Sequence, residues 1–129
     1  MPRAAQSTIT LLNNYFGAME SKDTERLGSY YADNITLTFA NAPTITGRDA
    51  MLDRMVTLLG QVRSLAHRLI NVWEEDGGVV IFEVLSIWHL DDDSVIEITA
   101  CSIFTIADHK FTDQRIYVDN APVDRFLLG

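Results

Sequence analysis

The sequence of 129 residues is poor in cysteine and has no long apolar run. Its single cysteine, Cys101, cannot form a disulfide within the chain, which is typical of a reducing compartment. No apolar stretch reaches the roughly 20 residues that a membrane-spanning helix needs, and the first residues lack the apolar segment of a signal peptide. These absences predict a cytoplasmic protein without a membrane partner.

Positive charge is also scarce. The chain carries 10 Lys and Arg against 18 Asp and Glu, which gives a formal net charge of -8. The basic residues are scattered along the sequence, so there is no cluster that could bind phosphate backbones. Two acidic runs, 74–76 and 91–93, lie where turns are expected and lack the spacing of a calcium loop. We therefore expect solvated turns there and no nucleic-acid partner.

Motifs for metals and serine nucleophiles are missing as well. None of the three histidines has the spacing of a metal-binding pair, and no Gly-x-Ser-x-Gly sequence occurs. Cys101 lies in an apolar stretch, which favours inert packing over reactivity. The sequence predicts neither a metal site nor a cofactor.

What the chain does contain is enough for one compact domain over residues 1–129, without linkers or repeats. In the first half, apolar residues at helical spacing predict a helix over 11–19 and another over 51–59 that opens after Gly47. Between them we expect a short helix capped by Asp23, with Leu27, Tyr30 and Tyr31 on one face. A turn at residues 33–34 should then lead into a strand over 35–39.

The second half changes to strand patterns joined by connections of hairpin length. Strands are predicted over 65–74, 79–90, 95–107 and 111–119. Helices followed by a long meander indicate an α+β fold, in which the helices cover the concave face of a strongly curved, mostly antiparallel sheet. A bent sheet closed by helices leaves a cone-shaped pocket for a small apolar molecule. The central strands are apolar on both faces, so we expect a homodimer through the convex face.

Three short segments, together with the order of the elements, carry a resemblance to a known family. The segments are Tyr-Ala-Asp-Asn at 31–34, Gly-Arg-Asp at 47–49 and Arg-Ile-Tyr-Val-Asp at 115–119. In combination they resemble the nuclear-transport-factor-2-like superfamily, and within it the SnoaL-like group. The resemblance implies a cone-shaped roll, also described as a cystatin-like α+β barrel. Because that superfamily includes cyclases, isomerases, hydrolases, dehydratases and binding modules, the fold leaves the function open.

Similarity to limonene epoxide hydrolase is partial. Asn41 matches an asparagine that helps to hold the nucleophilic water, and Asp119 matches one of that family's acids. Phe39 stands in place of a water-holding tyrosine, and Val84 and Ser86 stand in place of an arginine and an aspartate. Epoxide opening needs both a base and a proton donor, so these differences argue against it.

Similarity to ketosteroid isomerase fails at other positions. Tyr15 matches the tyrosine that binds the substrate oxygen, but Phe39 occupies the position of the base and Ser102 that of the protonated acid. SnoaL-like cyclases depend chiefly on one aspartate near the end of the last strand. Asp119 occupies that position, so the resemblance leaves this mechanism intact.

The residues themselves give three candidates for chemistry, each with a structural alternative. Asp119 ends the last strand, where burial would raise its pKa toward neutrality, although it could simply cap a turn. Asn41 could bind a substrate oxygen or bond to the backbone of its own turn before Pro43. Tyr15 could donate a hydrogen bond to the substrate or be a packed core tyrosine.

Other residues are expected to form the wall of the pocket. His67 alternates with apolar residues along its strand, so it could be a second proton carrier in the cavity or a structural histidine. The remaining predicted wall residues are Phe39, Val84, Ser86, Trp88, Ser102 and Phe104.

The sequence thus supports two hypotheses. The first is a cofactor-independent enzyme that acts on an apolar carbonyl compound of polyketide-like or terpenoid type, in which Asp119 moves a proton while Asn41 and Tyr15 bind the substrate oxygen. The second is a non-catalytic, dimeric ligand-binding or association module. Its support is the absence of every two-acid arrangement found in the related enzymes.

Overall fold

The computed structural model describes residues 2–124 and contains one six-stranded sheet with the order β2-β1-β6-β5-β4-β3. Its strands are β1 (Tyr31–Phe39), β2 (Ile45–Thr46), β3 (Ser64–Glu75), β4 (Val79–His89), β5 (Val95–Ala107) and β6 (Lys110–Tyr117). The helices are α1 (Gln6–Glu20), α2 (Thr24–Gly28), α3 (Arg48–Gly60) and α4 (Ala121–Asp124). The predicted α+β class is confirmed.

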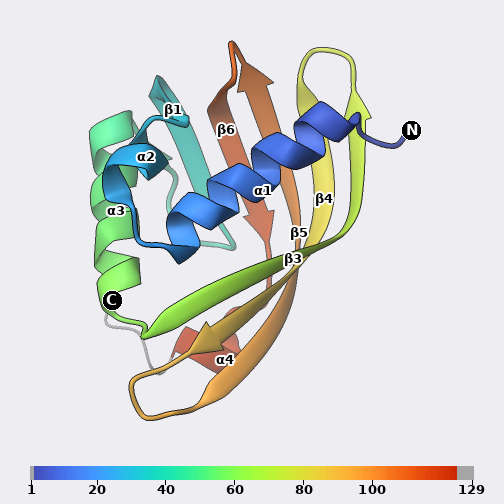
Figure 1. Cartoon of the computed structure of the whole chain (residues 1–129). Helices are drawn as coiled ribbons and strands as arrows, with labels where there is room; N and C mark the ends of the chain where they lie inside the picture. The colour runs from blue at the N-terminus through green and yellow to red at the C-terminus, as the bar shows by residue number, and fades with distance from the viewer. Residues whose placement is uncertain (1, 125–129) are drawn as a thin grey trace.

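Strand length explains the curvature of the sheet. The antiparallel strands β3, β4 and β5 are 12, 11 and 13 residues long, and all three bend together (Figure 1). The ladders shift register between Leu69 and Asn71 and between Thr105 and Ile106, and such irregularities increase local bending. Helix α1 packs on β3 and α3 packs on β1, so the helices cover the concave face as predicted.

The entry into β1 differs from the prediction. Helix α2 ends at Gly28, and β1 begins at Tyr31, so the expected helical face through Tyr30 and Tyr31 is wrong. Residues 33–34 lie within β1 beside a register shift, not in a turn. The cause is a tertiary contact: Phe111 N donates to Tyr30 O, and Tyr31 aligns with Phe111 in the parallel ladder between β1 and β6. Pairing with a distant strand therefore outweighs the local helical pattern.

One member of the acidic run 74–76 has a structural task that the sequence did not reveal. Helix α1 has no side-chain cap of its own, but the Glu74 carboxylate accepts hydrogen bonds from Ala5 N and from the Thr8 hydroxyl. A carboxylate at a helix N-terminus pairs with unsatisfied N–H groups and with the positive end of the helix dipole. Glu74 therefore ties α1 to β3, and the expectation of a solvated turn is wrong for this residue.

The Gly77–Gly78 turn joins β3 to β4 and requires glycine at its second position. Gly78 has a φ of +80°, and a Cβ built there would lie 2.1 Å from the carbonyl oxygen of Ile106. Only glycine allows this close approach between the turn and β5. The position of this turn therefore determines which side chains of β4 point to each face of the sheet.

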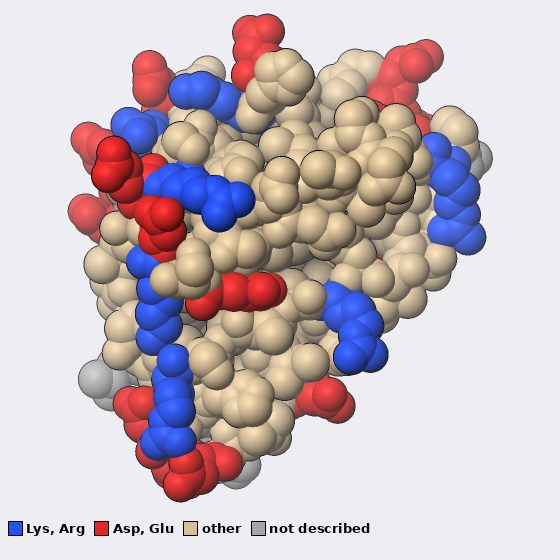
Figure 2. Space-filling model, in the orientation of Figure 1, with Lys and Arg blue, Asp and Glu red and all other residues tan. Residues whose placement is uncertain are grey.

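The convex face of the sheet carries the side chains that alternate with those of the concave face. Val95 and Tyr117 are exposed there, and Cys101 is exposed beside Tyr117 in the β5–β6 ladder. The expectation that Cys101 is packed inside the protein is therefore wrong. Lys and Arg side chains on the face shown in Figure 2 are separated by acidic and uncharged groups. No helix within residues 2–124 is long and apolar enough to cross a membrane.

Candidate active site

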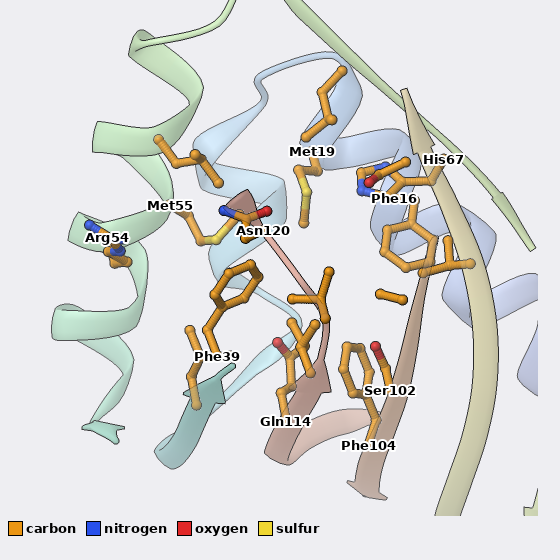
Figure 3. A pocket seen from close by; sticks show the side chains of 18 of the residues that line it. Phe16, Met19, Phe39, Arg54, Met55, His67, Ser102, Phe104, Gln114 and Asn120 are labelled. Carbon is orange, nitrogen blue, oxygen red and sulfur yellow. The ribbon is translucent and has the colours of Figure 1, made fainter. Parts of the chain in front are cut away.

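A cavity of ≈ 430 Å³ lies between the concave face of the sheet and helices α1 and α3 (Figure 3). Strands β4, β5 and β6 contribute alternate residues to its wall, because successive side chains of a strand point to opposite faces. The volume lies in the range of roughly 300–1,000 Å³ that is typical of small-molecule sites. A small molecule can therefore be accommodated between the sheet and the helices.

All seven residues predicted for the pocket wall line this cavity. Three lie on β4 and two on β5, where they alternate with residues of the convex face, and the other two come from β1 and β3. They are Val84, Ser86, Trp88, Ser102, Phe104, Phe39 and His67. In Figure 3, His67 lies beside Phe16, whereas Ser102, Phe104 and Gln114 lie together at another part of the wall.

Asp119 does not face the cavity, and its predicted burial is wrong. Its side chain is exposed and accepts a hydrogen bond from Ala121 N at 3.1 Å, so it caps the turn before α4. Strand β6 ends at Tyr117, and Val118 and Asn120 are the neighbours of Asp119 that line the cavity. The alternation of side chains therefore places Asp119 on the wrong side for proton transfer to a bound molecule.

Asn41 is likewise absent from the cavity wall. It is exposed in the turn after β1, where Ala40 has a φ of +50° and redirects the chain. The next two residues, Ala42 and Pro43, contact the cavity in its place. The expectation that Asn41 binds a substrate oxygen is not supported by this geometry.

Tyr15 lines the cavity as predicted, and it is also a packed core residue. Its hydroxyl lies 2.9 Å from the hydroxyl of Tyr31, which is fully buried. Burial raises the pKa of Tyr15 to about 12, although hydrogen bonding from Tyr31 acts in the opposite direction. Burial also raises the pKa of Tyr31. Both phenols therefore remain protonated at neutral pH and act as hydrogen-bond donors.

His67 is held by a residue that the sequence did not single out. Its Nδ1 lies 3.1 Å from Glu20 Oε2, and its backbone N donates to the same oxygen at 2.7 Å. The imidazole side chain is only 9% exposed and stacks on Phe16, with ring centroids 4.3 Å apart. The contact between Nδ1 and Glu20 fixes the ring in the cavity wall.

A signal for Glu20 was present, because Phe16 and Glu20 are four residues apart in α1 and share one face of the helix. Phe16 packs on His67, and its ring centroid lies 5.5 Å from that of Tyr15. One turn of α1 therefore brings a tyrosine, an imidazole and a carboxylate into one neighbourhood.

Acidic side chains are absent from the cavity wall over the described part of the chain. Within residues 2–124, no three His, Cys, Asp or Glu side chains gather in an arrangement that could hold a metal ion. The titratable groups of the wall are thus Tyr15, His67 and Arg54, an exposed residue of α3. Of these, the imidazole of His67 is the side-chain type that most often acts as a general acid or base.

The model for the SnoaL-like domain matches residues 12–114, which is most of the chain. The chain belongs to this family. Among curated proteins, none matches this chain. It is similar to the solved structure of an LEH-like epoxide hydrolase of M. tuberculosis, with 17% identity, a TM-score of 0.76 and coverage of 92% of this chain and 87% of that one.

Two further structures are similar to the SnoaL-like domain at 15% identity. A putative SnoaL-like polyketide cyclase from Jannaschia sp. CCS1 has a TM-score of 0.76, over 91% of this chain and 86% of that one. The epoxide hydrolase/cyclase-like enzyme SalBIII, which takes part in pyran ring formation in the polyether salinomycin, has a TM-score of 0.78, over 90% and 93%. At such low identity these structures establish the fold that was predicted and leave the reaction open.

Proposed function

We propose that this SnoaL-like domain is a small-molecule enzyme that transfers a proton on an apolar carbonyl compound, with His67 as the proton carrier. The supporting observation is the imidazole of His67, held by Glu20 on the wall of a largely apolar cavity and linked to Tyr15 through the ring of Phe16. His67 takes the position in the mechanism that the sequence suggested for Asp119.

The chemistry follows from the two ring nitrogens. His67 Nε2 accepts a proton from the carbon next to the carbonyl, the C–H electron pair forms a C=C bond, and the carbonyl π electrons move to oxygen. The hydroxyl of Tyr15 donates a hydrogen bond to that oxygen as negative charge develops. The Glu20 carboxylate accepts the Nδ1–H hydrogen bond and stabilises the imidazolium. Delivery of the proton from Nε2 to a different carbon of a conjugated enol completes an isomerisation. If Nε2 first exchanges its proton with solvent, return to the same carbon completes an exchange.

The aromatic wall supports this reaction by excluding water and by remaining rigid. Trp88 Nε1 donates to the Ser86 hydroxyl at 2.9 Å, and that hydroxyl donates to the Ile98 carbonyl at 3.1 Å. The indole is thereby fixed against the cavity. A rigid apolar wall strengthens the hydrogen bonds to a bound oxygen, because water does not compete with them.

The experiment that tests the proposal needs no knowledge of the natural substrate. The protein is incubated in D₂O with cyclic ketones of graded size, and NMR follows the loss of the α-proton signals. We expect catalysed exchange for ketones that enter the cavity, above the rate in buffer with a heat-inactivated sample. Ketones that bind without any acceleration of exchange would contradict the proposal.

A second candidate function is a non-catalytic ligand-binding or association module. The observation that favours it is the exposure of Asp119, together with a described cavity wall that has no carboxylate. The same NMR samples discriminate between the two functions, because a binding module shifts the ligand signals without incorporating deuterium.

The homodimer remains a prediction and is part of the proposal. Its support is the exposure of single apolar side chains on the convex face, namely Val95 at the start of β5 and Tyr117, which lies beside Cys101. Exposed apolar side chains are buried when such a face meets another subunit. We expect a dimer mass in sedimentation equilibrium and its dissociation by Tyr117→Glu, whereas a wild-type monomer at high micromolar concentration would contradict the dimer. The cytoplasm remains the expected compartment.

A further inference from the structure

Gln114 has an unusual position on the cavity wall. Its side chain is 1% exposed, and its Nε2 is the one buried side-chain N or O atom within residues 2–124 that makes no hydrogen bond of ordinary geometry, although the amide lies beside the Tyr15 hydroxyl. The residue lines the cavity. A buried amide donor without a partner destabilises a folded protein, and such groups frequently mark a place where a ligand binds.

The backbone around Gln114 holds this amide in place. Strand β6 is an interior strand, and Gln114 pairs with Leu37 of β1 on one side and with Phe104 of β5 on the other. Because neighbouring strands fix the backbone on both sides, the side chain cannot swing out to solvent. The amide is therefore held at the cavity wall, beside the Tyr15 phenol.

We propose that Gln114 Nε2 donates a hydrogen bond to the oxygen of the substrate, and that the substrate class is a ketone or the corresponding enol. This inference rests on the proposed function and names the substrate of the same site. Tyr15 supplies the second donor in the arrangement in which the Tyr31 hydroxyl donates to it, because the Tyr15 hydroxyl then keeps its own hydrogen for the ligand. A carbonyl oxygen has two lone pairs and can accept both bonds.

The two donors lie on neighbouring parts of the wall. The Gln114 amide is close enough to the Tyr15 phenol to lower its pKa, against the larger effect of burial. The Phe104 ring, whose centroid lies 6.4 Å from that of Tyr15, flanks this pair. The hydrocarbon part of a ketone then extends along the apolar wall toward His67.

The test compares a ketone with a hydrocarbon of the same shape, namely 2-acetylnaphthalene and 2-isopropenylnaphthalene. Their binding is measured by tryptophan fluorescence for the wild type and for Gln114→Met, which keeps the length of the side chain but removes the amide. We expect the ketone affinity to fall about tenfold, the effect of one hydrogen bond, and the hydrocarbon affinity to stay constant. Equal changes for both probes, or none for the ketone, would overturn the inference.

A second readout separates ligand binding from a structural role. Gln114→Met removes an unsatisfied buried group, so the Tm of the ligand-free protein should rise by several degrees, while the same substitution at the exposed Gln6 leaves Tm and affinity unchanged. A lower Tm, or failure to fold, would indicate a structural role and overturn the inference. Gln114→Asn keeps the amide but places it one methylene group farther from the ligand. We expect this variant to lose ketone affinity in the same way.

The result of the Gln114 binding test does not depend on whether the protein is an enzyme. Binding of the ketone requires no turnover, so selective loss of ketone affinity without any deuterium exchange would refute the enzyme and retain the ligand assignment. Conversely, His67 could catalyse the exchange while the wild type and Gln114→Met bind the ketone equally well. That result would refute only the assignment of Gln114.

Discussion

Replacing His67 by glutamine is expected to lower the rate of deuterium exchange into a bound ketone by roughly a hundred- to ten-thousandfold, the usual contribution of a general acid–base. Glutamine retains the size and polarity of the side chain but cannot carry a proton at neutral pH. The affinity for the ketone should change little, because the oxygen is bound elsewhere on the wall. The measurement is the NMR exchange rate at saturating ketone, together with the dissociation constant.

Glu20→Gln is expected to reduce the same rate by about tenfold or more, because an amide neither stabilises an imidazolium nor enforces the Nδ1–H tautomer. His109→Gln is the matched control for His67→Gln, since His109 is an exposed residue of the β5–β6 turn. Asp119→Asn is expected to keep full activity. If Asp119→Asn lost activity and His67→Gln kept it, Asp119 and not His67 would be the residue that transfers the proton.

The contrast between His67 and Asp119 shows what a strand pattern can predict. Strands β4 and β5 are bounded by clear turns, so the alternation along them placed Trp88 and Phe104 on the face that lines the cavity. Strand β6 stops two residues before Asp119, and the chain beyond it presents Asn120 instead. An error of one residue in a period-two pattern transfers a side chain to the opposite face.

Other features depend on contacts between distant segments and were beyond local patterns. Glu20 reaches His67 across 47 positions of sequence, and Glu74 caps a helix that begins 68 positions earlier. Apart from the place of Glu20 on the same helix face as Phe16, neither carboxylate differs in its local sequence from a solvated acid. The unpaired amide of Gln114 is equally invisible in sequence, because only the packed sheet removes its access to water.

The folded state itself is expected to depend most strongly on Phe104. This ring is 2% exposed, and its centroid lies 4.8 Å from that of Phe82 and 5.2 Å from that of Phe111. Both neighbours are oriented edge to face, an arrangement that adds to the energy of simple burial. We expect Phe104→Ala to lower the free energy of unfolding by about 3–5 kcal/mol, measured by urea denaturation.

Phe39→Ala is the matched control for this loss. Phe39 also lines the cavity, but it is only partly buried at the end of β1 and stands outside the aromatic cluster of Phe82, Phe104 and Phe111. Phe39→Ala should therefore lower the free energy of unfolding by less than half as much as Phe104→Ala. Equal losses in the two variants would contradict the importance of the cluster. Because Phe104 also lines the cavity, the space that the ring vacates remains continuous with it. Benzene should then raise the Tm of Phe104→Ala by mass action, and by more than it raises that of Phe39→Ala.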